Sequence, residues 1–327
     1  MLVQIHVVLY YVINSTRDTS QRCGKLRVFC FEVKMSITLK PPKTFSEQIQ
    51  ILKMRSLIIQ DNRMEDAIEF LRNNNYYRFS AYYKPYYVIE KKVIQEIFMP
   101  ETSFDDIKNL YSFDSDFRKI LTPLLESIEI SFRTHIAYYL AHRSGSLGYL
   151  DSGCFKNNEA HDNLMEIIRG VTRNPKEKFL LHHKVKYDDK YPVWVIIECV
   201  SLGNLSKLYS NLTTESKKEI CSEFYNNRHQ KQIKNWMQGI TIIRNISAHH
   251  GRLFNRDILV PDLDNITCHP IPGREKRIFS WLLVIKELAP NNDEWQSFLK
   301  GLDTIIEKYS FNRFANMGFP NNWKEFL

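Results

Sequence analysis

A long apolar stripe between residues 114 and 143 constrains the fold of this chain more than any other feature. Large apolar side chains recur there at helical spacing, and Gly145 follows as a stop. The stripe consists of Phe117, Ile120, Leu121, Leu124, Leu125, Ile128, Phe132, Ile136 and Leu140. Such a wide stripe predicts an amphipathic helix that must bury one face against other helices. Further helices are expected at about 160–170, 176–186, 193–202, 214–226, 230–247, 274–289 and 293–308.

The region before this helix also has helical signals. Thr44 and Glu47 form a capping box at the start of one helix, a second is expected over 64–73, and Ser103 with Asp106 caps a short third helix. Between them lies an aromatic stretch, 76–87, that suits an extended or irregular segment. Two interpretations of its rings stay open, namely core packing and a platform for stacking bases, flanked by Arg78 and Lys84.

These patterns predict an all-α fold, because no strong series of strands follows residue 100. We expect a helical domain over 101–327 and a smaller helical N-terminal region over 35–100, which contains the aromatic segment. Residues 1–34 show neither a sustained period nor the basic start and cleavage site of a secretory signal. They are either the product of an over-long start assignment, with Met35 as the natural start, or an accessory pair of strands.

The charge of the chain indicates what kind of partner it binds. The net charge is +8 and the pI about 9.0, which favours a polyanion, nucleic acid ahead of a membrane surface. No apolar run approaches the roughly 18 residues that a membrane span requires. The six cysteines form no CxxC pair, which indicates unreactive thiols in a reducing compartment, so we expect a cytoplasmic protein.

The segment 230–256 concentrates the polar chemistry. A buried stripe of an amphipathic helix ends there in a group of polar and cationic residues, with Gly251 as the expected backbone break. The group comprises Arg244, Asn245, His249, His250, Arg252, Asn255 and Arg256. Several buried cations without acids would be unstable, so either acids from elsewhere or a bound anion must compensate them.

Histidine and arginine suffice for cleaving RNA. The 2′-hydroxyl beside each phosphate is a built-in nucleophile, so the reaction needs a proton-transferring group and a cation for the charge on the phosphorane. The chain has no HExxH motif and no zinc-type His/Cys spacing. The sequence therefore predicts no metal and no other cofactor.

Arg244 and His249 have the form R-x4-H, with polar Asn245 after the arginine, and this resembles the active-site motif of the HEPN superfamily of RNases. The longer string RNISAHHGRLFNR resembles the abortive-infection family of the AbiD/AbiF kind more closely. Other matching pieces include NNYYRFSAYYKPY at 74–86, IEISFRTHIAYYLA at 128–141 and MGFPNNWKEF near the C-terminus. The resemblance covers about residues 37–326.

This resemblance implies a HEPN-type helical bundle and a metal-independent endoribonuclease that acts in phage defence. It also implies a homodimer in which two R-x4-H motifs meet. Arg244 and His249 would be catalytic, and Asn245 would orient His249 or bind phosphate, or else only make a helix-end hydrogen bond. His250, Arg252 and Arg256 are the expected phosphate contacts.

The spacing of Arg244 and His249 supports a dimer without reference to the family. Residues five apart lie about 140° around a helix, so Arg244 and His249 do not face one point on a straight helix. Either a second copy of the chain or a helix break near Ser247 could complete the site. Arg244 could also simply pair with an acid such as Glu129 or Glu198. Glu129 can itself pair with Arg133, four residues on, as support for the site or as a purely structural ion pair.

Two other functions stay open at this point. The same basic cleft could hold a structured non-coding RNA without cutting it. Alternatively, the chain could be a HEPN toxin subunit whose activity an antitoxin protein masks. In each case the partner is RNA or protein, and no membrane is involved.

Overall fold

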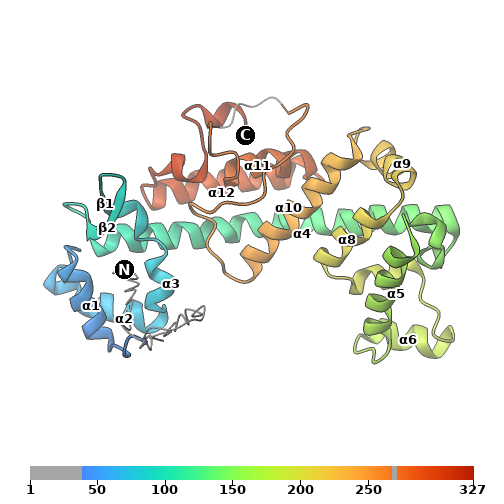
Figure 1. Cartoon of the computed structure of the whole chain (residues 1–327), viewed down its shortest axis with the longest axis horizontal. Coiled ribbons are helices and arrows are strands. Elements are labelled where there is room, and N and C mark those ends of the chain that lie inside the picture. Colours follow the sequence, from blue (N-terminus) through green and yellow to red (C-terminus); the bar gives the residue numbers. More distant parts are fainter. Residues whose placement is uncertain (1–38, 267–270) are drawn as a thin grey trace, which may run out of the picture. The chain divides into compact units, whose positions relative to one another are not determined.

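The computed structural model describes residues 39–266 and 271–327, so the extension expected at 1–34 lies outside the described residues. These ranges contain twelve α-helices, several short 3₁₀ turns and one two-stranded sheet (Figure 1). Contacts join residues 43–327 into one unit. The prediction of an all-α fold is confirmed.

The central element is α4, Phe104–Ser144, which is 41 residues long and extends about 60 Å at 1.5 Å per residue. We expected a short helix capped by Ser103 and a separate one from Asp114, and this division is wrong. The Ser103–Asp106 capping box starts one continuous helix, because no helix-breaking residue separates the two segments. Gly145, at φ +81°, ends it as expected. Its buried side chains pack against α10 (Gln230–Ala248), α11 (Ile278–Leu288) and α12 (Asn292–Lys308).

The N-terminal helices confirm the capping signals. Helix α1, Phe45–Met54, begins with the Thr44–Glu47 capping box, and α2 spans Met64–Asn73. The aromatic stretch is irregular: α3 (Tyr76–Ser80), a turn and a 3₁₀ turn over Lys84–Tyr86. Most of its rings are core, since Phe79, Tyr82, Tyr83 and Tyr86 are buried and Tyr77 is exposed. The packing interpretation therefore holds for most of the segment.

A β-hairpin that the sequence patterns did not predict follows this stretch. Strand β1, Tyr87–Glu90, pairs antiparallel with β2, Val93–Phe98. Lys91 and Lys92 form the turn, and both have positive φ. This is the geometry that hairpin turns of two residues require, although Asn-Gly and Asp-Gly are its usual sequences.

Five helices lie between α4 and α10: α5 (Asn158–Thr172), α6 (Lys178–Lys186), α7 (Val193–Ile196), α8 (Leu202–Asn211) and α9 (Thr214–Phe224). The single helix expected over 193–202 is wrong. Helix α7 ends at Ile196, a 3₁₀ turn follows, and Ser201 caps α8 through the Asn204 N–H. The carbonyl oxygens of Ile197 and Val200, which lie at this break, accept hydrogen bonds from Arg133.

The helix that carries the R-x4-H motif is held by a close crossing. A Cβ on Gly239 of α10 would lie 1.8 Å from the indole ring of Trp281 on α11, so only glycine fits there. Trp281 itself is fully buried. No helix in 39–266 or 271–327 combines the length and apolar character that a bilayer crossing needs.

Candidate active site

Helix α10 ends in a Schellman motif built on the two histidines. His249 is the C-cap, and His250 has φ +55°. The Gly251 N–H donates to the Ile246 carbonyl at 2.7 Å, and the His250 N–H donates to the Ser247 carbonyl at 3.1 Å. The left-handed residue is therefore His250, whereas we expected the break at Gly251. Glycine suits position 251 for a different reason: the backbone of Ile246 lies close to it, and a Cβ there would lie 3.2 Å from the Ile246 oxygen.

The helix remains regular up to Ala248, so the break considered near Ser247 is absent. The side chains of Arg244 and His249 consequently have different surroundings. Arg244 is half-buried and contacts α4, while His249 is exposed. The described residues include no side-chain hydrogen-bond or ion-pair partner for the His249 imidazole. This ring is therefore accessible from solvent.

Glu129 on α4 joins two arginines. Its Oε2 lies 3.0 Å from Nε of Arg244, and its Oε1 accepts a hydrogen bond from Nη2 of Arg133. Both the predicted Glu129–Arg133 pair and the alternative Arg244–Glu129 pair are thus present, whereas Glu198 is exposed. Arg133 is buried and also donates to the carbonyls of Ile197 and Val200 at 2.5 and 2.6 Å. A buried carboxylate with two cationic partners holds a fixed orientation.

This contact leaves much of the Arg244 guanidinium free. Nε is used by Glu129, and Nη1 lies 3.4 Å from Oδ1 of Asn245. The other N–H groups have no partner among the described residues, and the side chain is 40% exposed. Asn245 is itself exposed, and its side chain contacts Arg244 rather than His249. Arg244 can therefore bind an anion while Glu129 holds it.

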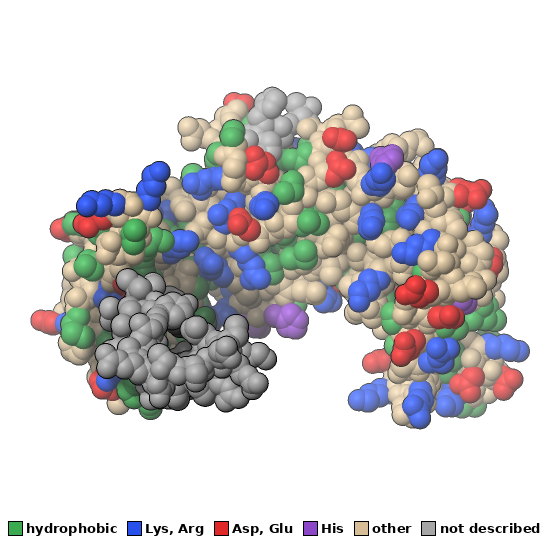
Figure 2. Space-filling model, in the orientation of Figure 1, with side chains coloured by type: hydrophobic (Ala, Val, Ile, Leu, Met, Phe, Trp, Pro, Cys, Tyr) green, Lys and Arg blue, Asp and Glu red, His purple; other side chains and the backbone are tan. Residues whose placement is uncertain are grey.

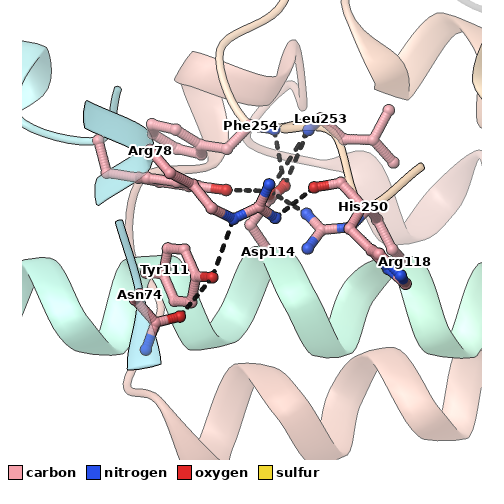
Figure 3. Close-up of polar contacts among 9 residues, drawn as sticks. Asn74, Arg78, Tyr111, Asp114, Arg118, His250, Leu253 and Phe254 are labelled. Atoms are coloured by element: carbon pink, nitrogen blue, oxygen red, sulfur yellow. Dashed lines mark hydrogen bonds and ion pairs between the residues drawn. The ribbon is translucent and has the colours of Figure 1, made fainter. Parts of the chain in front are cut away.

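A buried carboxylate from α4 fastens the loop after α10 (Figure 3). Asp114 is fully buried and accepts hydrogen bonds from the backbone N–H groups of Leu253 and Phe254, the shortest at 2.7 Å. The Tyr82 hydroxyl donates to it at 2.6 Å, and Arg118 pairs with it four residues along the helix. Burial raises the pKa of Tyr82, so this hydroxyl remains a donor. The loop is thereby fixed to α4.

Arg78 on α3 provides a second attachment. Its guanidinium donates to the carbonyl of His250 and, through Nε, to the Tyr111 hydroxyl at 3.0 Å. Tyr111 in turn donates to Asn74 at 2.8 Å (Figure 3). Arg78 was considered as a cation flanking stacked bases, but its contacts are those of a residue that supports the His250 backbone.

The remaining predicted cations lie on the same loop. Arg252 is half-buried with its guanidinium 6.0 Å from the centre of the Tyr82 ring, and burial lowers its pKa from the usual range. Arg256 is exposed and follows Asn255, which has a positive φ. Figure 2 shows Lys and Arg side chains over the surface formed by α4 and α10. The end of α10 thus combines an accessible imidazole with several cations, a set suited to a phosphodiester.

No group of three or more His, Cys, Asp and Glu side chains in the described part of the chain is arranged to hold a metal ion. Three histidines that the sequence also offered lie away from the motif and have other surroundings. His135 packs on Phe224 with its ring 3.0 Å from the Tyr225 hydroxyl, while His182 and His183 lie on α6.

Comparison with protein families gives one match. The family model described as Abi-like protein matches residues 69–255, more than half of the chain. The chain belongs to the Abi-like family. Neither a curated protein nor a solved structure matches it. Membership of this family suggests a role in abortive infection, a form of phage defence.

The Abi-like region contains the parts that build the site. It includes α3 with Arg78, all of α4, and α10 with the Schellman loop up to Asn255. Sequence reasoning missed Asp114 and Arg118 as parts of the site. The sequence did contain one signal. When the helix is extended back to Phe104, Asp114 and Arg118, four residues apart, fall on its apolar face, where charged residues need a partner.

Proposed function

We propose that this Abi-like protein is an abortive-infection effector that cleaves RNA without a metal ion, using Arg244 and His249. One observation carries the proposal. Glu129 binds Nε of Arg244, and apart from the contact of Nη1 with Asn245 the terminal N–H groups have no partner among the described residues. Arg244 lies on the same turn-and-a-half of helix that ends in the accessible His249 imidazole. A fixed cation and a proton-transferring group are the two components that cleavage at an RNA phosphate needs.

The reaction is an internal transesterification. A His249 imidazole removes the proton of the 2′-hydroxyl, the 2′ oxygen bonds to phosphorus, and the bond from phosphorus to the 5′ oxygen breaks. The leaving oxygen takes a proton from an imidazolium. The products are a 2′,3′-cyclic phosphate and a 5′-hydroxyl. Arg244 binds the phosphorane oxygens, where its forked donors meet two oxygens at once.

A homodimer completes this mechanism. Because α10 is regular to Ala248, Arg244 and His249 remain on different sides of one helix. A second copy related by a two-fold axis supplies a second imidazole, so that one acts as base and the other as acid. Asn245, His250, Arg252 and Arg256 then contact phosphates of the bound strand.

The test is cleavage of a defined RNA in EDTA by the full chain. We expect His249→Ala to lower the rate by at least about 10²-fold with little change in RNA affinity. Arg244→Ala should impair both rate and affinity, and Arg244→Lys should rescue only part, because a point charge cannot make the forked contact. His182→Ala, which changes an exposed histidine on α6, is the matched control.

Substrate analogues test the chemistry. DNA, and RNA with a 2′-methoxy group at the cleaved position, should resist, since both lack the nucleophile. A requirement for Mg²⁺, or full activity of the His249→Ala protein, would contradict the proposal. Binding of RNA that is salt-dependent but never followed by cleavage would favour the RNA-binding module instead.

The dimer has its own test. Sedimentation of the purified protein at micromolar concentration should give twice the mass of one chain, with or without RNA. A monomer under both conditions would argue against a site shared between two copies.

A further inference from the structure

A cavity lies away from the R-x4-H motif. Its volume is about 410 Å³, and it is lined by the 3₁₀ turn after α4, by α5 and by residues of α6 and the segment after it. This size is near the lower end of the range of about 300–1,000 Å³ that is typical of small-molecule sites. No step of the proposed cleavage uses it.

Four cations line this cavity. Arg169 and Arg173 come from α5 and its C-cap, Lys184 from α6, and Lys190 from the following segment, and all four are exposed. None has an ion-pair partner among the described residues. Asp189 also lines the cavity, but its Oδ1 accepts a hydrogen bond from the Tyr191 hydroxyl at 2.9 Å. Four cations against one acid leave a net charge of +3.

The arrangement of the arginines is unfavourable without a ligand. Arg169 and Arg173 are four residues apart, so they lie on one face of α5, where like charges repel each other. An anion between them would reverse this effect, because guanidinium groups bind phosphate through paired hydrogen bonds.

The interior of the cavity is apolar and aromatic. Tyr149 and Ile168 are buried, Met165 is half-buried, and Leu150 is partly exposed at 46%. The Tyr149 hydroxyl donates to the Tyr191 carbonyl at 3.0 Å, which fixes the ring. Inorganic phosphate would use the cations but not this surface. A ligand with a polyanionic end and a flat apolar end would use both.

We infer that this cavity binds a nucleotide, with its phosphates between Arg169 and Arg173 and its base against the apolar lining. The net charge of +3 is opposite in sign and similar in size to the charge of a nucleoside di- or triphosphate. The ligand could be a free nucleotide or the phosphorylated 5′ end of an RNA, since the two share this chemistry.

Calorimetric titration of the full-length His249→Ala protein tests the inference without depending on cleavage. The probes are ATP, GTP, inorganic triphosphate, and a short single-stranded RNA with a 5′-triphosphate or a 5′-hydroxyl. We expect at least one nucleotide probe to bind ten times more tightly than inorganic triphosphate. Binding by ATP or GTP identifies a free nucleotide, and binding by the 5′-triphosphate RNA alone identifies an RNA end.

Matched variants locate the binding. Arg169→Gln with Arg173→Gln should weaken it at least tenfold, and Leu150→Glu, which adds an acid to the lining, should weaken it similarly. Lys176→Gln with Lys178→Gln removes the same charge from exposed positions outside the cavity and should change affinity less than twofold. Equal binding of inorganic triphosphate and nucleotides, no effect of the two cavity variants, or no binding at all would overturn the inference.

Discussion

Asp114 on α4 accepts a 2.7 Å hydrogen bond from the backbone N–H of Phe254, 140 residues later in the chain. On the same helix, Glu129 holds Arg244 at 3.0 Å. The two carboxylates therefore fix both the last turns of α10 and the loop that follows it. The geometry of the R-x4-H motif depends on α4 as much as on α10.

Replacing Asp114 with asparagine should destabilise the fold by about 3 kcal/mol. The buried Arg118 loses its carboxylate partner, and the new amide NH₂ group faces N–H groups that need an acceptor. Urea unfolding measures the change in the free energy of unfolding. Asp162→Asn, at an exposed position on α5, is the control and should stay within about 0.5 kcal/mol of the parent. An equally small effect at Asp114 would show that the loop is held by other contacts.

Glu129→Gln should release Arg244 and leave the buried Arg133 without a carboxylate. We expect a loss of stability of about 3 kcal/mol, together with a fall in RNA cleavage at temperatures where the variant is still folded. Glu126→Gln, three residues earlier and exposed, should change neither quantity. A Glu129 variant that is destabilised but cleaves normally would restrict this residue to a structural role.

His250→Gly should raise the free energy of unfolding by about 1 kcal/mol, because glycine adopts the left-handed conformation at this position without strain. RNA affinity should fall in the same protein if the imidazole contacts phosphate. Gly251→Ala should have the opposite effect on stability, since its Cβ would crowd Ile246. Filter binding alongside thermal unfolding separates the two roles of position 250.

Burial lowers the pKa of His135 from 6.5 to about 4. The unfolded chain takes up this proton as the pH falls through about 6.5, while the folded chain takes it up only near pH 4. Stability should therefore decrease as the pH falls across this window. His135→Gln, which cannot titrate, should lose less stability than the parent between pH 7 and 4.5 in urea titrations. Parallel losses in the two proteins would contradict this explanation.

Local patterns in the sequence were sufficient for the class of fold and for part of the site. The capping boxes at Thr44 and Ser103, the stripe of α4 and the stripe of α10 each depend on residues within a few turns, so periodicity and hydrogen-bonding side chains identify them. The Glu129–Arg133 pair follows for the same reason, since its members are four residues apart. The R-x4-H motif and its resemblance are likewise properties of one short segment.

Only the tertiary structure showed which residues from distant segments contact each other. The contacts of Asp114 with Phe254 and of Arg78 with His250 join residues 140 and 172 positions apart, and no spacing rule relates them. At the break between α7 and α8, the carbonyl oxygens accept hydrogen bonds from Arg133, which lies on α4. Local propensity determines which segments become helices, whereas a buried charge is stable only where folding brings its partners to it. The sequence thus determined the helices and the motif, and packing against α4 decided how the motif is held.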